Sequence, residues 1–371
     1  MSPAWLLGLC AAAAYGLAWA TVDIPRPFLK CVVAGGTLLQ LGTLVYVSGL
    51  FGVAFPAVQT GLAASLAFLG GMLYSRTEGG RRKRVLREVL GDRVSPENFR
   101  RLVDDSQELP MDGTREQVAV LVCELVHAGE PELDDVATRV SSINRFLAAA
   151  SLVLARHGGY VAECDGEGLC ALFAPPVTPG TAAVAAIEAA FELADHRSSG
   201  IDFRIGVEQD EAVLGVFGSG QAGAFGASGP PLDFARRLAR WNLGLGTQVL
   251  VGPGAHAAAG QVFGFRPATL LTPPACDATS EVYEPLGRAD AAVSDAVREA
   301  RSLYWRGVVR VREARWQDAV ELLEPALALS GPDPLCEFHL ARAREALDVN
   351  ARAGSIRPSD GTGAPRVLTH P

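Results

Sequence analysis

The sequence predicts a chain of mixed α+β class, in which helices cover an antiparallel sheet and a block of membrane helices comes first. Two observations lead to this class. Residues 1–22 and 31–75 carry no charged side chain, and 49% of the 371 residues are hydrophobic against 20% charged. Between residues 118 and 287, β-patterned stretches alternate with helical ones in the order βαββαβ.

Charge and cysteine usage argue against several kinds of function. The net charge is −8, so the chain lacks the basic surface expected of a nucleic-acid-binding protein. The seven cysteines are scattered and form no CxxC pair, which argues against a disulfide framework and against a zinc knuckle. These features place the soluble part of the chain in a reducing compartment.

The N-terminal block, residues 1–75, is expected to cross a membrane three times, because each span needs about 20 apolar residues. The expected spans are residues 3–21, 30–50 and 57–75. A basic cluster follows the third span and consists of Arg81, Arg82, Lys83, Arg84 and Arg87. By the positive-inside rule, this is a multi-pass protein of the cell inner membrane or plasma membrane, with everything after residue 76 in the cytoplasm. A cleaved signal peptide is the alternative for residues 1–20.

Residues 76–117 are expected to form stalk or linker helices. Apolar side chains recur there at helical spacing, namely Val85, Leu86, Val89 and Leu90. Ser95 followed by Pro96 predicts the start of a second helix. The segment is either a rod that transmits a membrane signal or a plain linker.

The elements of residues 118–287 follow from periodicity and turn residues. Strands are expected at residues 118–125, 160–164, 168–173, 203–207, 213–217 and 248–251. Asp165 and Gly166 form the expected turn of a hairpin between the second and third strands. Helices are expected at residues 131–156, 181–196 and 232–241. This order makes a ferredoxin-like core, with helices on one face of an antiparallel sheet.

Three stretches of this domain follow one another with a characteristic order and spacing. They read HGGYVAECDGEGLCALFAPP at 157–176, FRIGVEQDEAVLGVFGS at 203–219 and GAFGASGPPLDFARRLA at 223–239. In this respect the chain resembles the class III nucleotidyl (adenylate/guanylate) cyclases. Residues 81–102 also resemble the stalk of membrane-anchored cyclase receptors that carry an extracellular CHASE-type sensor, although the sensor itself is missing here. The resemblance implies a cyclase-homology domain at residues 118–287.

The resemblance assigns two metal positions and two base-recognition positions. Glu124 and Glu167 stand where the family has two aspartates that hold magnesium, so Mg²⁺ or Mn²⁺ is the implied cofactor of an active enzyme, and none is implied otherwise. Glutamate is one methylene longer, which disturbs the octahedral geometry that Mg²⁺ requires. Asp165 is the alternative carboxylate. Glu163 replaces the base-reading lysine of adenylate cyclases and Pro230 replaces its acidic partner, so the pair no longer reads a purine.

Two further positions belong to the family's catalytic pair. Asp233 stands where the family has the asparagine that orients the ribose, whereas Arg237 matches its transition-state arginine. Four of these six positions now carry carboxylates. Carboxylates repel a triphosphate unless metal ions compensate their charge.

Residues 288–350 are expected to be helical and resemble a tetratricopeptide repeat. The positions that carry this resemblance are Gly307, Trp316, Ala319, Leu323 and Ala326. A single repeat cannot bury its own apolar face, so docking on the cyclase-like domain is expected in preference to partner binding. Residues 351–371, rich in Gly, Pro and Ser, are expected to form a disordered tail.

Departures in both halves of the site favour a degenerate cyclase, a pseudoenzyme with a regulatory or dimerisation role. Because the family builds its site between two chains, the resemblance implies a homodimer or heterodimer through the cyclase-like domain, with nucleotide binding weakened and no nucleic acid. The first alternative is an active cyclase that converts ATP or GTP to the cyclic 3′,5′-nucleotide with Glu124 and Glu167 as metal ligands. A non-catalytic nucleotide sensor is the second.

Overall fold

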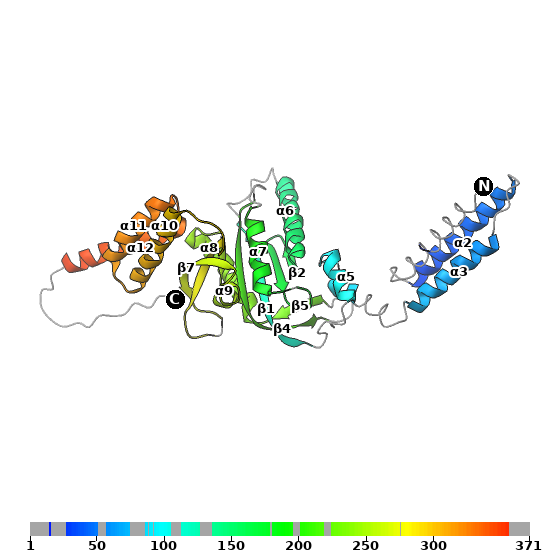
Figure 1. Cartoon of the computed structure of the whole chain (residues 1–371), viewed down its shortest axis with the longest axis horizontal. Coiled ribbons are helices and arrows are strands. Elements are labelled where there is room, and N and C mark those ends of the chain that lie inside the picture. The colour runs from blue at the N-terminus through cyan, green and yellow to red at the C-terminus, as the bar shows by residue number, and fades with distance from the viewer. Residues whose placement is uncertain are drawn as a thin grey trace. The chain divides into compact units, whose positions relative to one another are not determined.

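The computed structural model describes Tyr15 and residues 27–50, 57–74, 86–87, 89–91, 93–104, 113–126, 136–178, 180–195, 201–218, 224–274 and 276–355. These residues belong to two compact units, and each unit is described by itself. The smaller unit contains the N-terminal helices. The larger unit contains the sheet, apart from residues 216–225, and the helices that follow it (Figure 1).

Helices α2 (Pro27–Leu50) and α3 (Ala57–Tyr74) lie where the second and third membrane spans are expected. The first expected span, residues 3–21, lies outside the described residues apart from Tyr15. Judged on the described residues alone, no helix is both long enough and apolar enough to cross a membrane. The three-span arrangement therefore stays a prediction.

The stalk segment contains the helix that its sequence predicts. Helix α5 (Pro96–Asp104) begins at the residue that follows Ser95, as expected from the cap and the proline. Leu86 and Leu90, from the expected apolar face, are both buried. The burial indicates that these side chains pack and do not face solvent.

The first four strands of the larger unit form the expected core. The elements are β1 (Thr114–Leu125), α6 (Val136–Arg156), β2 (Tyr160–Asp165), β3 (Gly168–Phe173), α7 (Ala182–Asp195) and β4 (Phe203–Phe217). The strands lie in the order β2-β3-β1-β4, and all three neighbouring pairs are antiparallel. This is the ferredoxin-like order, so the predicted mixed α+β core is confirmed.

Strand β4 corrects one sequence prediction. Two strands, 203–207 and 213–217, are expected, but the structure has a single strand from Phe203 to Phe217. Its polar middle pairs with the first half of β1, where Asp210 lies opposite Val118 and Glu211 opposite Gln117. Because the backbone ladder continues, the polar residues do not form a turn.

The sheet extends beyond the core by strands that come later in the chain. The whole order is β2-β3-β1-β4-β6-β8-β7, with β5 (Ala224–Ser228) pairing with β4 off this path. The added strands are β6 (Val249–Val251), β7 (Phe263–Leu271) and β8 (Ser280–Arg288), and the short helix α9 (Pro253–Ala259) follows β6. Strand β6 runs parallel to β4, so the sheet is mixed.

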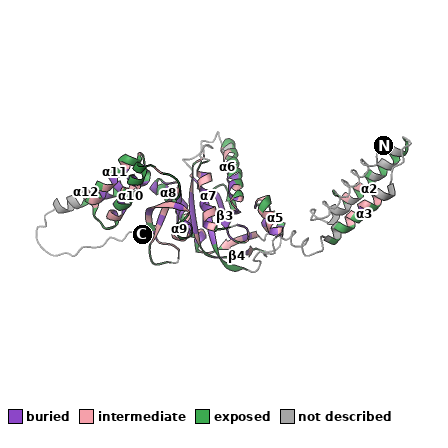
Figure 2. Cartoon of the chain, viewed as in Figure 1, coloured by how far each residue is buried: buried purple, intermediate pink, exposed green. Residues whose placement is uncertain are grey.

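Helices cover both faces of this sheet, whereas the sequence pattern predicts one covered face. Helices α6, α7 and α9 share a buried core with one face, whose β1 members are Ala119, Leu121, Cys123 and Leu125. Helix α8 (Pro230–Leu245) packs on the opposite face, because none of its residues belongs to this core and Ala235 of α8 lies against Gly206 of β4. Buried residues, drawn purple in Figure 2, lie in the sheet and in the helices that cover it. Gly206 permits the contact with α8, because a Cβ there would lie 2.1 Å from the carbonyl oxygen of Ala235. Because Gly206 has no side chain, α8 can pack directly against the backbone of β4.

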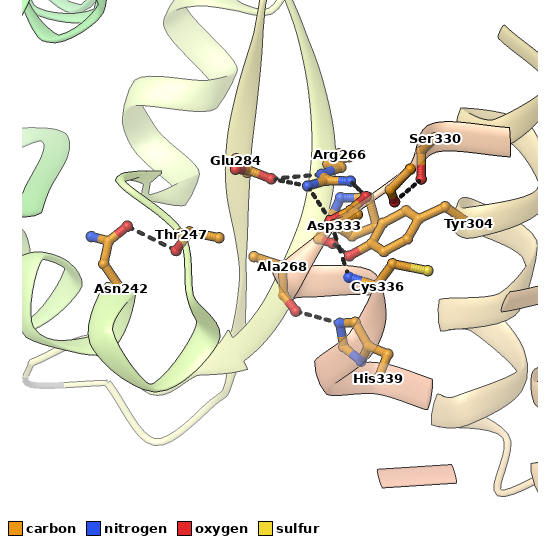
Figure 3. Close-up of polar contacts among 12 residues, drawn as sticks. Asn242, Thr247, Arg266, Ala268, Glu284, Tyr304, Ser330, Asp333, Cys336 and His339 are labelled. Atoms are coloured by element: carbon orange, nitrogen blue, oxygen red, sulfur yellow. Dashed lines mark hydrogen bonds and ion pairs between the residues drawn. The ribbon is translucent and has the colours of Figure 1, made fainter. Parts of the chain in front are cut away.

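Helix α8 is also held by a buried asparagine. The Asn242 side-chain nitrogen donates to the Ile205 carbonyl oxygen at 2.9 Å. The Thr247 hydroxyl donates to Asn242 Oδ1 at 2.8 Å (Figure 3). Asn242 is fully buried. A buried amide with satisfied hydrogen bonds fixes the position of the helix along the strand.

The C-terminal helices dock on the sheet, as expected. Helices α10 (Asp295–Arg312), α11 (Trp316–Ser330) and α12 (Pro334–Ser355) share a second core with α8 and the strands β6, β7 and β8. Gly307 brings α10 against α11, since a Cβ there would lie 2.6 Å from the side chain of Leu323. Helix α12 runs to Ser355, past residue 350 where the tail is expected to begin.

Candidate functional site

The predicted site residues come from two strands, a hairpin turn and a helix of the larger unit. Glu124 lies near the end of β1, Glu163 lies in β2, and Glu167 lies in the turn that connects β2 to β3. Strand β3 separates β1 from β2, with Gly168 opposite Glu124 and Cys170 opposite Glu163. Helix α8 contributes the remaining candidates.

Arginines of α8 bind two of the predicted carboxylates. Arg240 Nε donates to both oxygens of Glu124, at 3.1 and 3.3 Å. Arg236 Nη2 donates to Glu163 Oε2 at 2.5 Å, and Arg236 Nη1 lies 3.8 Å from Asp233 Oδ1. The hydrogen bond with Glu163 raises the pKa of Arg236 above its ordinary value. The two arginines are four residues apart, so they occupy the same face of the helix.

The turn that carries Glu167 is held by its neighbour. Asp165 Oδ1 accepts hydrogen bonds from the backbone nitrogens of Glu167, at 2.9 Å, and Gly168, at 3.2 Å. The Leu125 nitrogen in turn donates to the Glu167 carbonyl oxygen at 2.8 Å. The Glu167 side chain itself is exposed. Asp165 therefore shapes the hairpin, and its Oδ1 is engaged by backbone donors.

The remaining candidates lie in the first two turns of α8. Pro230 occupies the start of the helix, where its missing N–H costs nothing, and Asp233 is an exposed acid of the first turn. Arg237 Nη1 donates to the carbonyl oxygen of Thr272 at 2.8 Å, just beyond β7. Arg237 is therefore bound to the segment that follows β7 and not to the strands that carry Glu124 and Glu163.

Of the six predicted residues, the structure joins Glu124, Glu163 and Asp233 to two arginines of one helix. It shows no contact of Glu167 or Arg237 with these carboxylates. The sequence analysis expects the carboxylates to repel a polyanion unless metals compensate. In the structure, Arg236 and Arg240 supply compensating positive charge.

The donor set does not fit a resident Mg²⁺ or Mn²⁺. Both oxygens of Glu124 accept from Arg240, and Asp165 Oδ1 accepts from the turn. Within the part of the chain that the structure describes, no group of three or more His, Cys, Asp or Glu side chains is placed to hold a metal ion. Magnesium needs several oxygen ligands in near-ideal octahedral geometry.

Sequence reasoning missed a buried acid close to α8. Glu208 of β4 is only 3% exposed, and its Oε1 accepts from the backbone nitrogens of Gln209 and Gly254, both at 2.9 Å. Burial raises the pKa of Glu208 to about 7. Gly252 leaves room for this side chain, because a Cβ there would lie 1.5 Å from Glu208 Oε2. In the sequence, the glycines on either side of Pro253 are the feature that could have indicated a close approach of another side chain, here that of Glu208.

The chain is similar in fold to several solved structures. No protein-family model and no curated protein matches the sequence. The adenylyl cyclase CyaB from P. aeruginosa is 18% identical with a TM-score of 0.42, and the match covers 48% of this chain and 99% of that chain. The guanylyl cyclase Cya2 is 18% identical with a TM-score of 0.39, over 48% of this chain and 95% of that chain.

A third similar structure is the guanylate cyclase domain of RhGC from Catenaria anguillulae in complex with GTP. It is 16% identical with a TM-score of 0.40, over 47% of this chain and 99% of that chain. These three solved structures are one adenylyl cyclase and two guanylyl cyclases. None of these likenesses assigns a role to a residue of this chain.

Proposed function

We propose that this chain is a membrane-anchored, cyclase-like signalling protein whose cyclase-homology domain regulates or dimerises and does not turn over nucleotide. One observation carries the proposal: arginines of the chain's own α8 bind Glu124, at one of the two predicted metal positions, and Glu163, at one of the two predicted base positions. The remainder of the proposal, the membrane anchor and the dimer, rests on the sequence pattern and on the resemblance to class III cyclases.

The chemical reason lies in competition between cations. A metal ion that takes Glu124 as a ligand must compete with Arg240, whose Nε already donates to both carboxylate oxygens. At the base position, Glu163 is bonded to Arg236, and Pro230 has no side-chain donor or acceptor. The residues therefore satisfy one another without a triphosphate or its metal ions.

Exposed apolar side chains support the membrane anchor. Large apolar residues of α2 and α3 face outward, including Leu39 at 75% exposure and Leu73 at 67%. Such surfaces are unfavourable in water and favourable in a hydrocarbon phase. With the basic cluster after Tyr74, they fit helices that anchor the cyclase-like domain on the cytoplasmic side.

The test measures turnover and metal binding in the same preparation. Full-length protein in native-like membranes is incubated with ATP or GTP and either Mg²⁺ or Mn²⁺, and cyclic nucleotide is quantified. We expect no product above an empty-membrane control. We also expect the variant Arg240→Gln, which releases Glu124, to bind Mn²⁺ about tenfold more tightly than the wild type in electron paramagnetic resonance titrations.

Two variants make the result interpretable. Arg298→Gln removes an exposed guanidinium of α10 that pairs with Asp295, and it should leave Mn²⁺ binding unchanged. Adding Glu124→Ala to Arg240→Gln should abolish the gain. Turnover of ATP or GTP by the wild type, lost on Glu167→Ala, would contradict the proposal and identify an active cyclase.

The dimer is tested separately. Chemical cross-linking of the full chain in membranes should give a dimer, or a complex with a second protein that contains a cyclase domain. A strictly monomeric chain at every expression level would remove dimerisation from the proposal and leave its catalytic part untouched.

A further inference from the structure

An open cleft of about 320 Å³ lies between α10 and the β7–β8 hairpin, away from the residues of the candidate site. Three of its lining residues are arginines and two are aromatic. The lining consists of Gly264, Phe265, Arg266, Leu286, Arg301, Ser302, Trp305 and Arg306. Its volume lies near the lower limit for small-molecule sites, about 300–1,000 Å³.

One arginine of the cleft belongs to the structure of the protein. Arg266 pairs with Asp333 and Glu284, and its guanidinium lies 4.9 Å from the centre of the Tyr304 ring (Figure 3). Its charge is therefore already compensated by two carboxylates. Arg266 forms the floor of the cleft and is not available to bind an anion by itself.

The other two arginines are differently placed. The side chains of Arg301 and Arg306 in α10 form no hydrogen bond or ion pair with any residue that the structure describes. None of the lining residues is acidic. The cleft therefore holds two uncompensated guanidinium groups beside the Ser302 hydroxyl, which is an arrangement that attracts an anion.

An aromatic surface adjoins these charges. Trp305 is 45% exposed, which is a large fraction for a tryptophan. It lies four residues after Arg301 and next to Arg306, on the part of α10 that faces the cleft, and Phe265 lines the cleft from β7. Flat aromatic groups of a ligand stack favourably on such side chains.

We propose that this cleft binds a nucleoside monophosphate, with the phosphate between Arg301 and Arg306 and the base against Trp305. A phosphate dianion accepts several charge-assisted hydrogen bonds, so it matches two guanidinium forks and a hydroxyl better than a single carboxylate does. The ligand would bridge helix and sheet, so it would stabilise the docked α10–α12 helices by mass action.

The test is calorimetric titration of the full chain, in detergent, with AMP, adenosine and inorganic phosphate. AMP should bind, whereas adenosine and phosphate should each bind at least about tenfold more weakly, because each lacks one half of the recognised group. The double variant Arg301→Gln/Arg306→Gln and the single variant Trp305→Leu should each weaken AMP binding by about tenfold or more.

Control variants separate this cleft from the rest of the molecule. Arg298→Gln removes a guanidinium of the same helix that pairs with Asp295, and it should bind AMP as the wild type does. Arg237→Gln alters the candidate site and should also leave AMP binding unchanged. Circular dichroism of each variant checks folding, and Arg306→Lys, which keeps the charge but loses the fork, should bind with intermediate affinity.

Three results would overturn the proposal. The first is no binding of AMP at millimolar concentration. The second is equal binding of phosphate and AMP, which would show an anion site without base recognition. The third is loss of AMP binding in Arg237→Gln with retention in the double variant, which would assign the nucleotide to the cyclase-like face. None of these results depends on whether the protein makes a cyclic nucleotide.

Discussion

Arginine–carboxylate pairs occur in two regions of this molecule, and the two regions differ in burial. On the candidate site, the side chains of Arg240 and Glu124 are 69% and 26% exposed. The second region, the seam, is where β7 contacts the C-terminal helices, and it contains Arg266, Tyr304, Asp333 and His339. There the side chains of Arg266 and Asp333 are 16% and 10% exposed. The chemistry is the same, but water reaches the pair on the candidate site more easily than the pair beside the C-terminal helices.

In the seam, side chains of the C-terminal helices also donate hydrogen bonds to backbone carbonyl groups of an edge strand, β7. Strand β7 is the last of the sheet, so some of its carbonyl groups have no strand partner. The Tyr304 hydroxyl donates to the Pro267 oxygen at 2.6 Å, and His339 Nε2 donates to the Ala268 oxygen at 2.8 Å. The helical segment therefore completes the sheet, whereas the pairs on the candidate site only balance charge.

This difference predicts unequal costs of losing an arginine. Replacing Arg266 by Met leaves Asp333 and Glu284 buried without a counter-ion, so the free energy of unfolding should fall by about 3–5 kcal/mol. Arg240→Met removes an exposed partner and should cost about 0–1 kcal/mol. Urea unfolding of the full chain, followed by tryptophan fluorescence, measures both. Equal losses would show that the two regions do not differ in the way their burial indicates.

The seam should also be sensitive to acid. Burial lowers the pKa of His339 from 6.5 to about 4. Between these values the unfolded chain binds a proton that the folded chain does not, so stability is present above pH 6.5 and is lost as the pH falls towards 4. The loss amounts to about 3 kcal/mol.

The measurement is the difference in unfolding free energy between the wild type and His339→Gln at several pH values. Glutamine can still donate to the Ala268 oxygen but does not titrate, so this difference should move against the wild type as the pH is lowered from 6.5 to 4. A difference that does not change with pH would mean that the seam opens enough to hydrate His339.

A similarly small effect is expected at the second arginine–carboxylate pair of the candidate site, Arg236 with Glu163. Glu163 is 56% exposed, so Arg236→Gln should change the free energy of unfolding by less than about 1 kcal/mol. The change should shrink further as salt is raised from 0.05 to about 0.5 M, because salt screens exposed charges. A larger, salt-independent loss would mean that Arg236 holds α8 in place.

Local signals explain which parts of the fold could be predicted. The β2–β3 turn follows from Asp165 and Gly166, and α5 begins at Pro96 as its cap predicts. These signals act over a few residues, so no distant contact is needed to interpret them. The antiparallel core order follows from the succession of such elements.

Strand β7 was missed, and its sequence shows why. Pro267 interrupts the β pattern and removes a backbone donor, which normally argues against a strand. Here β7 is an edge strand, and Tyr304 and His339, far along the chain, bond to its carbonyl groups. Only the docked helices make this segment a satisfied strand.

At the candidate site, too, some features could be predicted from the sequence and others depend on the tertiary structure. The sequence by itself determined that carboxylates stand at the predicted metal and base positions and that Arg237 stands at the catalytic one. It did not determine that Arg236 and Arg240 bind Glu163 and Glu124, or that Arg237 bonds instead to the oxygen of Thr272. Those choices depend on where α8 lies along the sheet. Gly206 of β4 leaves room for α8, and Asn242 of α8 donates to the Ile205 oxygen of β4. Because β4 and α8 are separate elements along the chain, only the tertiary structure decided which residues the three arginines bind.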